Sequence, residues 1–165
     1  MKGYKFLLKG YKSAYGDFTY EIGNTYEHEG EIKLCKSGFH YSREIRDAFL
    51  YVNGDHCVEI EAGGNIIEDD SKCVCSEITI VKELNITEIL EILSKDENSG
   101  VRCVVTENQN TSSEILEILS KDKDVYVRYA VAKNQSISIE ILKILSGDKD
   151  GGIRNTAREN INKRK

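Results

Sequence analysis

The sequence predicts an α+β protein in which a small, mostly antiparallel, β-rich N-terminal domain at residues 1–84 precedes a three-unit α-helical solenoid at residues 85–165. Two observations predict this division. Eleven of the thirteen aromatic residues lie in residues 1–51, in segments that alternate between apolar and polar positions. The second half instead repeats itself every 26 residues, which is the signature of stacked helical units.

The N-terminal half begins with segments typical of β-strands. Residues 4–12 and 17–34 are rich in Tyr, Phe, Thr and Ile, and Gly-Asn and Glu-Gly pairs mark turns between strands. Residues 57–62 and 76–84 alternate in a similar way. We therefore expect two further strands here, joined by a loop at residues 63–72.

A helix is predicted at residues 42–52, between these strands. Ile45, Phe49 and Val52 would share one face, and Ser42 is a suitable N-cap residue. The stretch that leads into this helix, "KLCKSGFHYS" at residues 33–42, is expected to be a structural corner.

In this corner we expect Cys35 and Phe39 to pack inward, with Ser37-Gly38 forming the turn. Glycine and serine are frequent turn residues because they tolerate or stabilise turn backbone conformations.

The repeat occupies three units at about residues 86–111, 112–137 and 138–163. Three residue types recur at the same register: glutamate (Glu88, Glu114, Glu140), arginine (Arg102, Arg128, Arg154) and asparagine (Asn108, Asn134, Asn160). Three registers kept over three copies are a strong signal of structural repetition.

Each unit is predicted to contain two short helical segments. In the first copy the motif "EILEIL" supplies the apolar residues Ile89, Leu90, Ile92 and Leu93, and a second segment begins at the Val-Arg pair. Neither segment can bury its apolar face alone, so the units must stack to form a shared core. The N-terminal domain and the polar C-terminal tail are expected to cap the two ends.

The pattern L-x-x-D-x-x-x-x-VR-x-x-VA-x-N resembles HEAT-type helical repeats, most closely the leucine-rich repeat variant, over roughly residues 84–162. This resemblance implies a HEAT-like solenoid that holds other molecules. The chain has Gln109, Gln135 and Ile161 where members often carry proline. It also lacks the close cysteine runs of iron–sulfur ligation, so no cofactor is expected.

The N-terminal half resembles a domain of unknown function found in phage and prophage proteins. The residues that carry this resemblance are "TYEIGNTYE", "GEIKLCKSGFHYS", "VEIEAGG" and "SEITI", within residues 1–84. It implies an origin in a phage or another mobile element, with no established activity.

The repeated arginines have two interpretations. Arg102, Arg128 and Arg154 could form a basic stripe that binds an acidic partner or a phosphate. They could instead pair with the repeated aspartates (Asp96, Asp122 and Asp148) and tie neighbouring units together. Because Arg and Asp recur together, the second interpretation is favoured, and the recurring Asn is expected to satisfy backbone groups at turns.

Three residues of the middle unit are candidate partner contacts. Tyr126, Tyr129 and Lys133 replace a Gly, a Cys and a Glu of the first unit, so they are not part of the repeat framework. A non-framework aromatic can anchor an interface. It can equally fill a gap between helices.

Residue types that bind zinc are present, but their spacing does not predict a metal site. No pair has the usual C-x2-C spacing, and the thiols are expected to behave as small apolar core residues. A Cys35–His40 catalytic pair is also not expected, because no family signature surrounds it. The six residues concerned are Cys35, His40, His56, Cys57, Cys73 and Cys75.

Residues 38–52, followed by a strand and then "SEITIV", resemble the core of ADP-ribosyltransferase folds. This resemblance implies that Glu77 is a catalytic carboxylate that stabilises an oxocarbenium-like centre on NAD, and that His40 and Tyr41 shape the nicotinamide pocket. It is the runner-up to a non-enzymatic function. In the simpler interpretation, Glu77 is a solvent-facing strand residue.

Composition favours a cytoplasmic protein. The net charge of −5 argues against nucleic-acid binding along the repeat face. No apolar run approaches the ~18 residues of a membrane span, and the first residues lack the apolar core of a signal peptide. The two family resemblances, together with the absence of a complete catalytic set in the sequence, imply a non-enzymatic interaction module, encoded by a phage or mobile element, that binds a host or competing protein and inhibits it, for example a defence protein.

Overall fold

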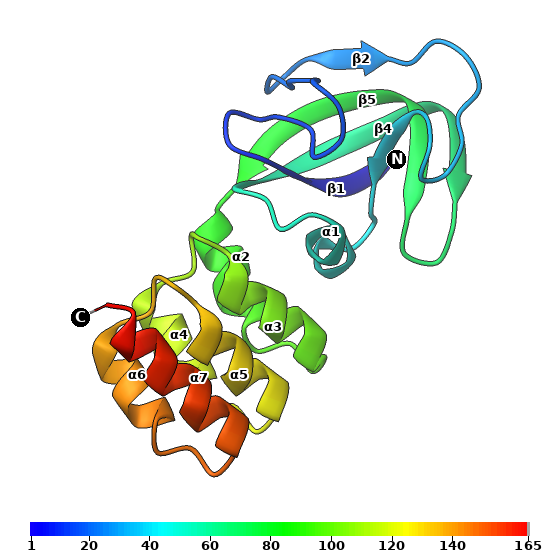
Figure 1. Ribbon diagram of the computed structural model, residues 1–165. Coiled ribbons are helices and arrows are strands. Elements are labelled where there is room, and N and C mark those ends of the chain that lie inside the picture. The colour runs from blue at the N-terminus through cyan, green and yellow to red at the C-terminus, as the bar shows by residue number, and fades with distance from the viewer. Residues whose placement is uncertain (165) are drawn as a thin grey trace. The chain divides into compact units, whose positions relative to one another are not determined.

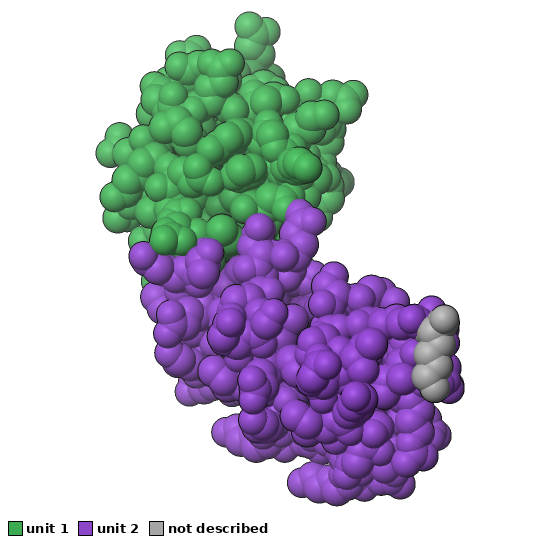
Figure 2. All heavy atoms as spheres, turned by 90° about the vertical axis from the view of Figure 1, so that its left-hand side faces the viewer, with its two compact units in different colours: residues 1–86 green, residues 87–165 purple. Residues whose placement is uncertain are grey.

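The computed structural model describes residues 1–164. The chain divides into two compact units, Met1–Ile86 and Thr87–Lys165 (Figure 2). Each unit has its own secondary structure and core, and together they make an α+β protein with an antiparallel sheet followed by a set of packed helices.

A five-stranded sheet forms the N-terminal unit (Figure 1). Its strands are β1 (Lys2–Leu7), β2 (Thr25–Glu27), β3 (Phe39–Tyr41), β4 (His56–Glu68) and β5 (Cys73–Leu84). The order is β1-β4-β5-β2, and β3 also pairs with β5. Every pairing is antiparallel, as the sequence predicts.

The strands expected at residues 4–12 and 17–34 are much shorter in the structure. Residues 8–24 form loops, because Gly10, Gly16 and Gly23 adopt positive φ angles that interrupt extended backbone. Aromatic side chains from these loops nevertheless pack on the sheet. Tyr20 is buried, and its ring meets Tyr26 edge to face at 5.5 Å between centroids.

The loop expected at residues 63–72 is mostly strand. β4 continues to Glu68, and Ile66 and Ile67 pair with Cys75 and Val74 of β5. A register shift between Gly63 and Ile66 absorbs the irregularity that glycine introduces, as in a β-bulge. Only residues 69–72 turn the chain between the two strands.

Helix α1 (Ile45–Tyr51) confirms the helix predicted after the corner, but Ser42 is not its N-cap. The N-cap position is Glu44. Ser42 is buried, and its backbone exchanges two hydrogen bonds with Tyr4, so it extends the pairing beside β3. Phe49 anchors the helix by packing its ring 5.1 Å from that of Phe6.

The corner at residues 33–42 also differs from the prediction. Cys35 is exposed and holds a positive φ of 60°, and the turn lies at residues 34–36 between the bridged pair Lys33 and Ser37. Phe39 packs against the core as expected.

Gly38 follows this turn with φ 96° and lies against the sheet. A Cβ there would stand 2.7 Å from Val74 Cγ2, so only glycine fits without a shift of its neighbours.

Six helices form the described part of the C-terminal unit, two for each repeat. They are α2 (Ile86–Leu93), α3 (Ser99–Glu107), α4 (Ser113–Leu119), α5 (Val125–Lys133), α6 (Ile139–Leu145) and α7 (Gly151–Asn162). The second helices of the repeats, α3, α5 and α7, lie side by side (Figure 1). No helix within residues 1–164 is long and apolar enough to cross a membrane.

Capping residues recur with the repeat. Ser112 and Ser138 accept hydrogen bonds from the amides of Ile115 and Ile141 at the starts of α4 and α6. Asn98, Asp124 and Asp150 cap α3, α5 and α7 in the same way. These caps satisfy amides that have no partner within the helix.

The first helix of each repeat buries three of the four apolar residues of its motif. In α2 these are Ile89, Leu90 and Leu93, whereas Ile92 is 70% exposed, contrary to the prediction that it contributes to the core. At 100° per residue, Ile92 lies off the face shared by the other three.

Candidate functional site

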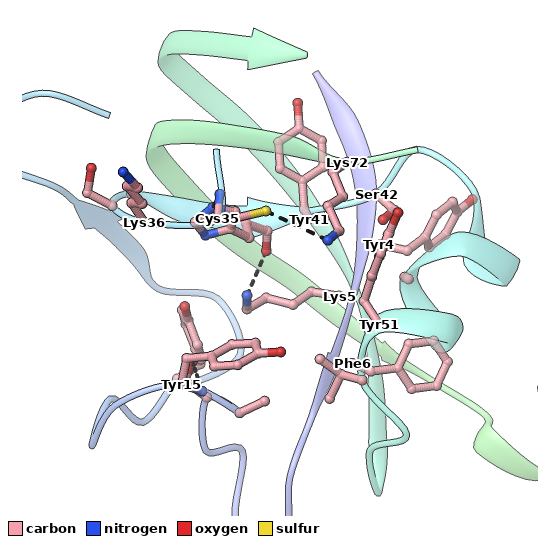
Figure 3. Close-up of a pocket in the computed structure, with 18 of the residues that line it drawn as sticks. Tyr4, Lys5, Phe6, Tyr15, Cys35, Lys36, Tyr41, Ser42, Tyr51 and Lys72 are labelled. Atoms are coloured by element: carbon pink, nitrogen blue, oxygen red, sulfur yellow. Dashed lines mark hydrogen bonds between the residues drawn. The ribbon is translucent and has the colours of Figure 1, made fainter. Parts of the chain in front are cut away.

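A cavity of about 720 Å³ opens in the N-terminal unit (Figure 3). Residues of β1, β3, α1, the two long loops and the β4–β5 turn line it. Three lysines contribute, Lys5, Lys36 and Lys72. The aromatic lining residues are Tyr4, Phe6, Tyr15, Tyr20, Tyr41 and Tyr51.

Lys5 extends from β1 into this space. Its amine donates to the His40 carbonyl oxygen at 2.6 Å and lies 5.5 Å from the centre of the Tyr20 ring. Burial lowers the pKa of the Lys5 amine to about 8, although the nearby Cys75 thiol opposes the shift. The amine is therefore partly neutral in mildly alkaline solution.

His40 lies on β3 beside Lys5. Its Nε2 accepts a hydrogen bond from the Cys35 amide at 2.7 Å, so the ring proton is placed on Nδ1. Burial lowers the pKa of His40, and the charges of Lys5 and Lys72 lower it further. The imidazole is thus held neutral in a positively charged environment.

Lys72 reaches the same space from the β4–β5 turn. Its amine lies 3.9 Å from the centre of the Tyr51 ring and 3.7 Å from Cys35 Sγ. Figure 3 shows the amines of Lys5 and Lys72 pointing into the space next to Cys35. Two cations from different elements therefore converge on one cavity.

Of the three residues in the ADP-ribosyltransferase interpretation, the structure brings only two to the cavity. His40 and Tyr41 line it, but Glu77 is not among its lining residues. Glu77 pairs in the sheet with Glu27 and Gly63, and its carboxylate lies over Gly63. Glu77 therefore does not share this cavity with His40 and Tyr41.

Three cysteines of the N-terminal unit are buried and one, Cys35, is exposed. Burial raises the pKa of each of the buried thiols, Cys57, Cys73 and Cys75. Within residues 1–164, no group of three or more His, Cys, Asp or Glu side chains is placed to hold a metal ion. His40 Nε2 is occupied by the Cys35 amide, which leaves that lone pair unavailable to the Cys35 thiol.

A second polar cluster lies near the C-terminal end of β1, where the loop after β1, the start of β4 and the end of β5 meet. The Glu83 carboxylate accepts from the Tyr11 hydroxyl at 2.6 Å and lies 2.7 Å from His56 Nδ1. Burial raises the pKa of Glu83, but these hydrogen bonds outweigh it and the pKa falls below its usual value. Tyr11 stacks on His56 and holds a positive φ of 58°. Sequence reasoning missed this cluster because its residues lie far apart in the chain.

The repeated arginines form internal ion pairs. Arg102 binds Asp122 of the next repeat, and Arg128 binds Asp148 in the same way, with Nε to Oδ2 distances of 2.8 and 2.7 Å. Both guanidinium groups are buried and are not available as a surface stripe. Arg154 Nη1 donates to the carbonyl oxygens of Asp148 and Lys149.

The repeated asparagines make the complementary connection. Asn134 donates to the carbonyl oxygen of Thr106, and Asn160 donates to those of Ala132 and Asn134. The asparagines thus bind backbone of the preceding repeat, which confirms their expected role in satisfying backbone groups.

The surface of the repeats carries the remaining candidates. Tyr126 is 73% exposed, Tyr129 is 43% exposed, and Lys133 is also exposed. Most of the Tyr126 side chain is therefore accessible to a partner, and part of the Tyr129 side chain is. Exposed isoleucines add a feature that sequence reasoning missed: Ile92, Ile118 and Ile144 occupy the same register of α2, α4 and α6 and are 70%, 60% and 51% exposed. Their 26-residue spacing was the available signal.

Residues 1–92 match the family described as Domain of unknown function (DUF7666). The chain belongs to this family. The DUF7666 match contains all the residues that line the cavity, together with Tyr11, His56 and Glu83. It ends within α2, so most of the repeat unit lies outside it. No curated protein and no solved structure matches the chain.

Proposed function

We propose that this protein is a non-enzymatic interaction module whose helical repeats bind another protein. The observation that carries the proposal is the recurrence of one exposed isoleucine in each repeat, Ile92, Ile118 and Ile144. Single exposed apolar residues are common on protein surfaces. The same apolar residue at the same helical register in three successive units instead favours a surface that contacts another molecule.

The separate roles of the residues within each repeat support this proposal. The repeated Arg, Asp and Asn side chains hold one unit to the next, so they are used within the fold. The isoleucines make no comparable contribution to the core, since each lies off the buried face of its helix. Proteins built from stacked helical repeats bind partners through the extended surfaces that the stacking creates.

Tyr126 and Tyr129 provide a second set of contacts on α5. Tyrosine is enriched among residues that dominate binding energy, because it offers a large apolar face with a hydroxyl at its tip. Lys133, at the end of the same helix, adds an exposed positive charge. These three residues differ from their counterparts in the other repeats and would give the surface its specificity.

The proposed partner is a host or competing protein whose activity is inhibited by binding, such as a defence protein. The support is the resemblance of the N-terminal half to a phage-associated domain, which would place the chain in a phage or another mobile element. The repeat unit would then supply the binding surface.

Two alternatives receive less support. ADP-ribosyl transfer in the N-terminal unit would need Glu77 beside His40 and Tyr41, and Glu77 does not line their cavity. Nucleic-acid binding along the repeated arginines would need accessible guanidinium groups, and those of Arg102 and Arg128 are buried in ion pairs. The net charge of −5 also opposes it.

Site-specific photo-crosslinking tests the proposal in cells that express the full chain. A photo-reactive residue is placed at Ile118, at Tyr126, or at the exposed control position Lys123 in the turn before α5. We expect one protein to crosslink from position 118 or 126 and not from 123. Equal crosslinking from all three positions, or none from positions 118 and 126, would contradict binding through these surfaces.

A further inference from the structure

We propose that the cavity of the N-terminal unit binds a small anion that carries a planar ring, with Lys5 and Lys72 holding the anionic group. Nucleoside monophosphates and aromatic carboxylates share this chemistry. The inference rests on residues 4–72 alone and is independent of the function proposed for the repeats.

The charge of the cavity selects for anions. Three lysines line it, and no aspartate or glutamate is among the described residues that do so. Lys5 bonds the His40 carbonyl oxygen and Lys72 lies beside Cys35 Sγ, so both amines face the same cavity (Figure 3). In a partly enclosed space, such like charges attract a counter-ion more strongly than they would in open solvent.

The two amines keep donors for a ligand. An ammonium group has three N–H donors. Lys5 uses one on the His40 carbonyl oxygen. Lys72 is held over the Tyr51 ring and near Cys35 Sγ, which are weak acceptors compared with a phosphate or carboxylate oxygen. An entering anion would therefore improve the hydrogen bonding of both lysines.

The aromatic lining selects for a planar ring next to the anion. Each of the two lysines already lies against an aromatic face, Lys5 on Tyr20 and Lys72 on Tyr51. Tyr15, which is 79% exposed, stands at the opening of the cavity. A ligand whose anion contacts the amines would bring its ring against these tyrosines, where stacking adds to the affinity.

The size of the cavity and the tight packing of part of its wall fit such a ligand. Its volume of about 720 Å³ lies within the range of small-molecule pockets. Its wall is tightly packed around Gly38, where a Cβ would meet Val74 and Ile32. The Tyr41 ring likewise leaves no room for a side chain at Gly3. A preformed site binds without the cost of ordering its residues.

Calorimetric titration of the full chain tests the proposal. The probes are adenosine monophosphate, uridine monophosphate, benzoate, the uncharged nucleosides, and inorganic phosphate. We expect at least one of the ring-bearing anions to bind, and its uncharged or ringless counterpart to bind at least about tenfold more weakly. Binding of the monophosphates alone would identify a phosphate, and binding of benzoate alone a carboxylate. If none of the three ring-bearing anions binds, the proposal is wrong.

Two lysine variants locate the binding site. Lys72→Gln should weaken binding about tenfold, because it removes one charge-assisted hydrogen bond. Lys9→Gln is the matched control, since Lys9 is an exposed lysine of the same unit that does not line the cavity. Unchanged affinity in Lys72→Gln, or equal loss in both variants, would overturn the assignment.

Chemical modification of Lys5 provides a test that needs no substitution in β1. An amine-reactive reagent in mildly alkaline solution should modify Lys5 in the free protein, and saturating ligand should protect Lys5 but not Lys9. Peptide mass spectrometry measures both sites. If Lys5 is modified equally with and without the bound anion, the ligand does not occupy this cavity.

Discussion

Arg102 of the first repeat and Asp122 of the second form a two-pronged ion pair, in which Nε and Nη2 donate to the two carboxylate oxygens at 2.8 and 2.9 Å. The side chains are only 6% and 10% exposed. Arg128 and Asp148 repeat the arrangement one unit later. Arg102 and Arg128 thus bind the following repeat, whereas Asn134 and Asn160 bind the preceding one, so polar bonds join the repeats in both directions.

Removing one partner of such a pair should destabilise the repeats strongly. Arg128→Leu leaves the Asp148 carboxylate buried without its main partner, and we expect a loss of about 3–5 kcal/mol in the free energy of unfolding. Urea denaturation followed by circular dichroism measures it. The exposed pair Lys121–Glu117 is the control, and Lys121→Gln should change stability by less than about 1 kcal/mol.

A double variant separates the charge from the packing. Arg128→Met with Asp148→Asn removes both charges. In the wild type the Asp150 backbone N–H donates to Asp148 Oδ1, and the side-chain amide oxygen of the variant can still accept this hydrogen bond. We expect the double variant to be more stable than Arg128→Leu. If the double variant is less stable than Arg128→Leu, the unpaired charge of Asp148 is not the cause of the loss in the single variant.

Acid should weaken the repeat unit. The hydrogen bond from Arg128 lowers the pKa of Asp148. Burial raises the pKa of Asp122, but the bond from Arg102 outweighs it, so that pKa also lies below its usual value. An aspartate carboxyl in the unfolded chain has a pKa of about 4. The stabilisation is therefore complete above that pH and is lost as pH falls through the lower pKa values of the folded state.

Unfolding free energies of the wild type and Arg128→Leu across the acid range measure this effect. The unfolding free energy of the variant should depend less on pH, because Asp148 has lost the hydrogen bond that lowered its pKa. Identical slopes in the two proteins would show that the pair does not cause the acid sensitivity.

Two glycines with similar backbone angles should respond differently to alanine. Gly38 and Gly16 have φ angles of 96° and 79°, so alanine is strained by about 1 kcal/mol at either position. A Cβ at Gly38 also meets Val74, Ile32 and the Cys75 carbonyl, whereas Gly16 has open space around it. We expect Gly38→Ala to be the more destabilising by about 1–3 kcal/mol, measured by denaturation. Equal losses would mean that the wall of the cavity is not tightly packed.

Glu83 should stabilise the end of the sheet through Tyr11 and His56. Its hydrogen bond raises the pKa of the Tyr11 hydroxyl above its ordinary value. Glu83→Gln removes the negative charge, so the Tyr11 pKa should fall toward that ordinary value. Tyrosine ring chemical shifts measured as a function of pH report this change. A Tyr11 titration that is the same in the variant and the wild type would contradict the assigned bond.

The sequence was sufficient to predict the repeats because their contacts recur with the chain. The shared spacing of Arg102 and Asp122 indicated a pair between neighbouring units, and the spacing of the asparagines indicated backbone contacts. The motif "EILEIL" does not by itself distinguish Ile92 from its apolar neighbours. The exposure of Ile92 follows from its angle around α2.

The cavity could not be predicted because its residues meet through the sheet. Lys5, His40 and Lys72 come from β1, β3 and the β4–β5 turn, and the pairing of these strands sets their distances. The corner at Cys35 was misplaced for a related reason: a positive φ at a non-glycine residue has no clear sequence signal. The extent of β4 was missed because Gly63 and Gly64 resemble a loop but form a bulge.

One affinity measurement tests the proposal that the exposed isoleucines bind a partner protein. The partner identified by crosslinking is titrated with the full-length wild type, with the triple variant Ile92→Gln/Ile118→Gln/Ile144→Gln, and with Lys123→Gln as control. Because each replaced side chain is exposed, the triple variant should keep its fold, as circular dichroism can verify. We predict at least about a hundredfold loss of affinity in the triple variant and none in the control. An unchanged dissociation constant in the folded triple variant would contradict the account.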